Sequence, residues 1–97
     1  MFEFESTPIS ISHEEFNRMI VKEEFETIKS ILIDVRDKHN YLTDFANKIN
    51  KLIQKESIYE YTKKESKFVL GILYQYACRY RIYCFKSVDI LLKKLLE

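Results

Sequence analysis

Two cysteines and two histidines are the residues of this sequence best suited to binding a metal ion. Cys78 and Cys84 lie six residues apart and His13 and His39 lie 26 apart, so neither pair has the CxxC or HxxxH spacing that brings ligands to one ion. On a helix, six residues turn two thiols about 120° away from each other. We therefore expect no metal site, and we expect free thiols that pack as small apolar residues.

Catalytic chemistry has no recognisable motif either. The sequence contains no Gly-rich phosphate loop, no P-loop and no nucleophile elbow. The acidic residues near the two histidines, Glu14, Asp37 and Asp44, are ordinary neighbours at helix ends. A helical chain of 97 residues also rarely has volume to spare for an active-site pocket. We expect a protein that is not an enzyme and that uses no cofactor and no small-molecule substrate.

Residues 74–85, YQYACRYRIYCF, combine tyrosines and cysteines with two arginines. Arg79, Arg81 and the nearby Lys86 are suited to phosphate contacts, and the tyrosines between them are suited to base stacking. This segment makes a DNA-binding accessory or regulatory protein the alternative prediction. A net charge of only +1 argues against it, because nucleic-acid-binding domains are usually strongly basic.

The composition indicates how such residues are positioned. The chain has one Gly, one Pro and 46% hydrophobic residues, which favours long helices with few turns. We predict an all-α fold, a small bundle of three to four helices that forms a single domain over residues 13–97. Residues 1–12 are predicted to be an extended arm or a short edge strand, because apolar residues alternate with polar ones around Pro8.

Capping boxes mark two helix starts. Ser12 with Glu15 predicts a helix from near His13 to His39 or Asn40, and Thr62 with Glu65 predicts another from near Lys63. The apolar stripe of the first helix changes phase near residues 22–24, which indicates one bent helix or two joined helices. Between these regions, a second helix is predicted from a stripe of six apolar residues: Leu42, Phe45, Ala46, Ile49, Leu52 and Ile53.

The third predicted helix has two apolar sides. One side carries Val69, Ile72, Leu73, Tyr76, Tyr80, Tyr83 and Cys84, and the other carries Leu70, Tyr74, Cys78, Ile82 and Phe85. The second line is either a homodimer seam or docking surface, or core covered by the other helices. A strand over residues 79–85 is an alternative, since RYRIYCF is rich in β-formers.

The last part of the chain allows two interpretations. Ser87 is a candidate cap for a final helix over residues 88–96 with an inner face of four residues, Val88, Leu91, Leu92 and Leu95. A continuous helix over residues 63–96 is also compatible with the pattern.

Charge is unevenly distributed along the chain. Residues 1–47 carry a net charge of −5 and residues 48–97 carry +6. The two halves either complement each other within the fold or across a dimer, or the basic half meets an anionic partner. No run approaches the length of a membrane span and no signal peptide is recognisable, so we expect a soluble cytoplasmic protein.

Together these features favour a protein that works by binding another protein. We predict a small non-catalytic binder that neutralises or regulates a specific partner protein, as immunity proteins, inhibitors or small regulators do. The partner is either another protein or a second copy of the chain in a homodimer. A composition rich in Lys, Ile, Tyr and Phe and poor in Ala and Gly is typical of AT-rich bacterial or phage genomes, in which compact helical proteins of this kind occur.

Overall fold

The structure is a computed structural model and describes residues 12–76 and 85–97. This part of the chain forms, in order, α2 (His13–Lys38), α3 (Thr43–Ile53), the 3-10 helix η1 (Ile58–Glu60), α4 (Lys63–Tyr76) and α6 (Phe85–Leu95). The described residues contain no strand, so the predicted all-α helical bundle is confirmed. The arm predicted for residues 1–12 lies outside the described residues except for Ser12. Residues 79–84, which belong to the segment predicted as helix or strand, also lie outside them.

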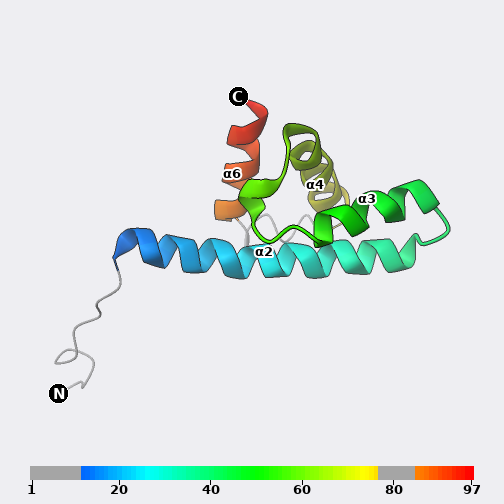
Figure 1. The fold of residues 1–97 in the computed structure, drawn as a ribbon, viewed down its shortest axis with the longest axis horizontal. Helices are drawn as coiled ribbons and strands as arrows, with labels where there is room; N and C mark the ends of the chain where they lie inside the picture. Colours follow the sequence, from blue (N-terminus) through cyan, green and yellow to red (C-terminus); the bar gives the residue numbers. More distant parts are fainter. Residues whose placement is uncertain (1–11, 77–84) are drawn as a thin grey trace, which may run out of the picture.

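The longest helix, α2, lies under the other three (Figure 1). It begins as predicted, because the Ser12 hydroxyl accepts a hydrogen bond from the backbone N–H of Glu15 at 3.2 Å. It ends at Lys38, where the N–H of His39 reaches back to the carbonyls of Val35 and Arg36. The helix is continuous over 26 residues, or about 39 Å. The phase change of the apolar stripe near residues 22–24 therefore lies within one helix. It shows that a different side of the helix becomes apolar there, and not that two helices meet.

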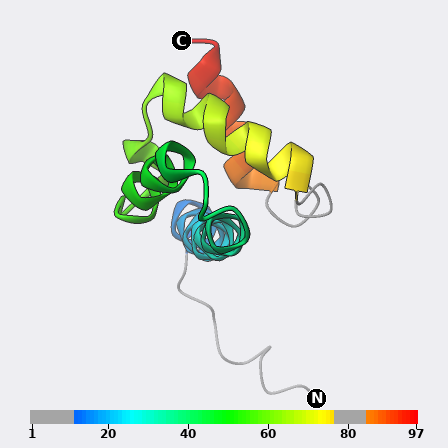
Figure 2. The ribbon, with the colours of Figure 1, turned by 90° about the vertical axis from the view of Figure 1, so that its right-hand side faces the viewer.

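The other helices all lie on one side of α2, as the view along its axis shows (Figure 2). α3 packs on α2, while α4 and α6 pack on each other and on α2. Between them lies a core of fully buried apolar side chains. Its most deeply buried members are Ile28, Leu32, Ile49, Leu52, Ile58, Tyr61, Val69, Leu73 and Leu91.

The connection between α3 and α4 contributes to this core. Ile58 of η1 is buried, and Tyr61, the residue that follows η1, is only 1% exposed. The centre of the Tyr61 ring lies 5.8 Å from that of Phe25 on α2. Burial raises the pKa of the Tyr61 hydroxyl far above its ordinary value. The segment between α3 and α4 therefore packs against both α2 and α6.

The predictions for the C-terminal part need correction. A continuous helix over residues 63–96 is wrong, because α6 packs beside α4 and a single straight helix does not fold back on itself. Ser87 is not a helix cap: it is the third residue of α6 and is fully buried. Its backbone N–H donates to the Glu24 carboxylate at 2.8 Å, so the N-terminal end of α6 is held by a side chain from α2.

The inner face of α6 also differs in part from the prediction. Leu91 is fully buried and Val88 packs against the core, as expected. Leu92, however, is 48% exposed, and Ile90 packs against the core in its place. α6 contacts both α2 and α4. Because the two helices lie on different sides of α6, the residues that become buried are not those of a single apolar stripe.

Candidate binding groove between α3 and α4

A groove of about 680 Å³ runs between α3 and α4. We call it the α3–α4 groove. Its apolar lining consists of two residues of α3 and three of α4, which are Phe45, Leu52, Phe68, Ile72 and Tyr76. The rings of Phe45 and Phe68 meet edge to face with centroids 5.6 Å apart, so the two helices touch through side chains that line the groove. A concave apolar surface of this size is typical of a ligand or peptide site.

Lysines stand on both sides of this apolar lining. Lys48 and Lys51 belong to α3, and Lys64 and Lys67 belong to α4. All four are exposed, and none of them forms an ion pair with a carboxylate of the described residues. The Lys48 ammonium lies 5.7 Å from the centre of the Phe68 ring, close enough for a cation–π contact. Low-dielectric walls and four positive charges attract an anionic ligand.

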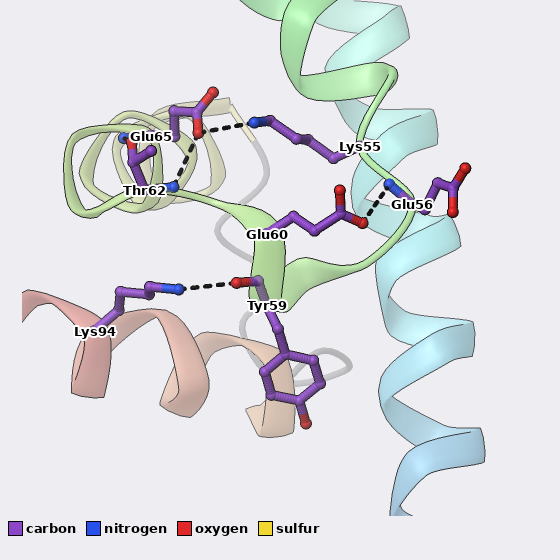
Figure 3. Close-up of polar contacts among 7 residues, drawn as sticks. All are labelled: Lys55, Glu56, Tyr59, Glu60, Thr62, Glu65 and Lys94. Atoms are coloured by element: carbon purple, nitrogen blue, oxygen red, sulfur yellow. Dashed lines mark hydrogen bonds and ion pairs between the residues drawn. The ribbon is translucent and has the colours of Figure 1, made fainter.

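Among the described residues that line the groove, Glu65 is the only acidic one. Its carboxylate already has two polar partners (Figure 3). Its carboxylate accepts a hydrogen bond from the backbone N–H of Thr62 at 2.9 Å and lies 3.4 Å from the ammonium of Lys55. The Thr62 hydroxyl in turn accepts from the Glu65 N–H at 3.1 Å. This reciprocal pair is the capping box predicted from the sequence, and it leaves the groove strongly positive.

The same contacts predict how stability depends on pH. Burial pushes the pKa of Glu65 upward, but the N–H of Thr62 and the charge of Lys55 outweigh it, so the pKa lies below its ordinary value of 4.5. A carboxyl group with a lowered folded-state pKa stabilises the fold above its unfolded pKa, and this stabilisation is lost as the pH falls through the folded value.

We therefore expect the free energy of unfolding of Glu65→Gln to fall less than that of the wild type when the pH drops below 4.5. Urea titrations followed by circular dichroism at a series of acidic pH values measure the difference. Glu56→Gln is the matched control, because the Glu56 side chain is exposed. Parallel pH profiles for wild type and Glu65→Gln would contradict the assignment.

Gly71 lies in the middle of α4 and lines the groove. It is the only glycine of the sequence, and its backbone does not have a positive φ. A Cβ added there would meet no atom of residues 12–76 or 85–97 within 4 Å. The helix therefore does not require glycine at this position, and the consequence of having it is an open stretch of α4 backbone at the groove.

The residues predicted as a partner surface lie only partly within the described chain. Leu70 is half-buried against the core, and Tyr74 is 67% exposed. Cys78 and Ile82 lie outside the described residues, and Phe85 is described only as the first residue of α6. Neither Leu70 nor Tyr74 lines the α3–α4 groove, so the predicted seam remains a separate prediction on another side of α4.

Of the three residues predicted for nucleic-acid binding, only one lies within the described part of the chain. Arg79 and Arg81 lie outside the described residues. Lys86 is half-buried, and its ammonium donates to the side-chain oxygen of Asn17 at 2.9 Å, which links α6 to α2. Its described contact is therefore internal to the bundle.

No three His, Cys, Asp or Glu side chains of residues 12–76 and 85–97 lie where they could hold a metal ion together. None of the helices in the same part of the chain combines the length and apolar character that crossing a bilayer requires.

The groove was not predicted from the sequence, although the spacing of its lysines is visible there. Lys48 and Lys51, and likewise Lys64 and Lys67, are three residues apart, which places each pair on one face of its helix. The sequence pattern does not show that the two faces look toward each other. Comparison with known proteins adds no further guide, since no protein-family model, curated protein or solved structure matches the chain.

Proposed function

We propose that this protein is a small, non-catalytic cytoplasmic protein that binds and thereby neutralises or regulates a specific partner protein. The α3–α4 groove is the binding site, and it receives an acidic amphipathic segment of the partner. The observation that carries this proposal is the combination of an apolar lining with four lysines that have no carboxylate partner among the described residues.

The two parts of the groove contribute differently to binding. Burying apolar side chains against Phe45, Phe68 and Tyr76 supplies affinity, at about 25 cal/mol per Å² removed from water. The lysines supply orientation and a faster association with an acidic partner, rather than affinity alone. An amphipathic helix whose apolar side faces the groove, with acidic residues along its edges, matches both parts.

Gly71 gives independent support for an occupied groove. A glycine in the middle of a helix costs roughly 0.5–1 kcal/mol relative to alanine, and neither its own backbone angle nor any contact with the described residues requires it here. A residue without a side chain lets a second backbone approach closely. The stability given up at Gly71 is explained if a partner segment lies directly over it.

Nucleic acid is the alternative ligand for a lysine-rich surface. Single-stranded nucleic acid binds where aromatic rings offer their faces to bases. In the groove, Phe68 is half-buried and meets Phe45 edge to face, while Lys48 lies over its ring. The apolar lining therefore favours a polypeptide with apolar side chains over a chain of stacked bases.

Substitutions at Gly71 test the proposal. We expect Gly71→Ala to raise the free energy of unfolding by about 0.5–1 kcal/mol, whereas Gly71→Leu fills the groove and weakens binding by at least about tenfold, equivalent to about 1.4 kcal/mol. Fluorescence anisotropy measures binding of a labelled amphipathic peptide with glutamates beside its apolar face. A peptide with lysines in place of the glutamates and a short single-stranded DNA are the comparison ligands.

Asn47→Leu is the control for Gly71→Leu, because Asn47 is an exposed helical residue outside the groove lining. It should bind the acidic peptide as the wild type does. Tighter binding of DNA than of the acidic peptide, with a steep salt dependence and no effect of Gly71→Leu, would favour the nucleic-acid alternative and reject the proposed one.

A further inference from the structure

The first turns of α2 carry an apolar patch on the side that faces away from the bundle. Phe16 and Met19 are each 52% exposed. At 100° per residue, the buried residues Val21, Phe25 and Ile28 lie about 120–180° around the helix from both of them. Figure 1 shows these turns extending past the other described helices. We call Phe16 and Met19 the α2 patch.

Exposed carboxylates accompany the α2 patch. Glu15 precedes Phe16 directly, and Glu23 lies one helical turn beyond Met19 on the same side of the helix. Both are exposed, and they belong to the half of the chain whose net charge is −5. Lys22, three residues beyond Met19, is also exposed on this side, so the carboxylates around the α2 patch exceed this lysine by one. The α2 patch with its surrounding charges is therefore a mildly acidic amphipathic helix surface, which is the kind of ligand proposed for the α3–α4 groove.

We infer that the protein associates with itself, the α2 patch of one copy binding in the α3–α4 groove of a second copy. Phe16 and Met19 lie against the apolar lining of the groove, and Glu15 and Glu23 lie near Lys64, Lys67 and the lysines of α3. The inference rests on the proposed function in one respect, which is that the groove binds acidic amphipathic helices.

The contact has to form between two copies. α3 and α4 both pack on the side of α2 that holds its buried residues, and the α2 patch lies on the opposite side. Since α2 is one continuous helix, it does not bring its own patch to its own groove. Each copy therefore offers one patch and one groove, and the pairing either closes as a reciprocal dimer or continues from copy to copy.

Self-association of this kind regulates the groove. A groove that holds the α2 patch of another copy is closed to the partner protein, and the partner has to displace that copy. By mass action, the fraction of open grooves falls as the protein concentration rises. Binding of the partner is then expected to dissociate the self-associated form.

A charge exchange tests the inference. Sedimentation velocity at low ionic strength should show a mean mass of the wild type that rises with concentration. Glu15→Lys combined with Glu23→Lys, called the patch variant, should stay monomeric. So should Lys64→Glu combined with Lys67→Glu, called the groove variant. An equimolar mixture of the two should associate again, because each basic surface then meets an acidic one.

Apolar substitutions give a second measurement that does not depend on charge. Phe16→Ser with Met19→Ser should abolish association, whereas Leu96→Ser, at a residue that is 86% exposed, should leave it unchanged. Circular dichroism confirms that each variant is folded.

A monomeric wild type at all concentrations overturns the inference, and so does association that persists in the groove variant or a mixture that fails to associate. The acidic peptide separates these results from the proposed function. If the peptide binds a wild type that remains monomeric, the self-association is wrong and the binding function stands. If the mixture associates but the peptide does not bind, self-association stands and the partner-binding function fails.

Discussion

Leu32→Ala is expected to lower the free energy of unfolding by about 3–4 kcal/mol, within the range for fully buried leucines. The Leu32 side chain is 0% exposed and belongs to the buried stripe of α2, on which the other helices pack. Alanine removes apolar contacts and leaves a cavity that α3, α4 and α6 are not free to close. Small domains are stable by only about 5–15 kcal/mol, so this variant should lose a large fraction of its stability.

Ile33→Ala is the matched comparison, because Ile33 is the next residue of the same helix and is 36% exposed. It should cost less than about 1 kcal/mol. Urea denaturation followed by circular dichroism gives both values from the midpoints and slopes. Equal losses for the two variants would mean that the buried side of α2 has been assigned incorrectly.

Glu24→Ala is expected to lower the free energy of unfolding by about 2–3 kcal/mol. Glu24 is 6% exposed, and its carboxylate accepts the backbone N–H of Ser87 near the start of α6. The first N–H groups of a helix have no partner within the helix and carry a partial positive charge. Removing the carboxylate leaves a buried N–H unsatisfied and removes a favourable charge from the end of the helix.

Two further variants separate these contributions. Glu24→Gln keeps an acceptor oxygen and should cost clearly less than Glu24→Ala, whereas Glu23→Gln changes an exposed neighbour and should change stability by no more than about 0.5 kcal/mol. Thermal unfolding by calorimetry measures all three. A loss for Glu24→Ala as small as that for Glu23→Gln would show that the contact to α6 contributes little.

The helix starts were predictable because capping is local. Ser12 with Glu15 and Thr62 with Glu65 lie three residues apart, so the interaction that starts each helix is visible in the sequence. The apolar stripe of α3 was readable in part: Ile49 and Leu52 are buried as expected, but Leu42, the first predicted member, precedes α3 and is 46% exposed. The two helix starts, which are decided by neighbours along the chain, were therefore predicted correctly.

Features decided by distant contacts were not predictable in the same way. Ser87 resembles a helix cap, but the group that satisfies its N–H comes from Glu24, 63 residues away. Leu92 continues an apolar stripe, yet the position of α6 between α2 and α4 turns Ile90 inward instead. The groove requires the relative placement of α3 and α4, and the spacing of the lysines within each helix does not contain that information.

The position of α2 beneath all the other helices has a consequence for synthesis on the ribosome. Its apolar side, including Ile28 and Leu32, is covered by α3, α4 and α6, which are all translated later. Until α6 has left the exit tunnel, part of the apolar side of α2 stays exposed in the nascent chain. We expect chaperone capture to be strongest during this interval, when exposed apolar surface is aggregation-prone.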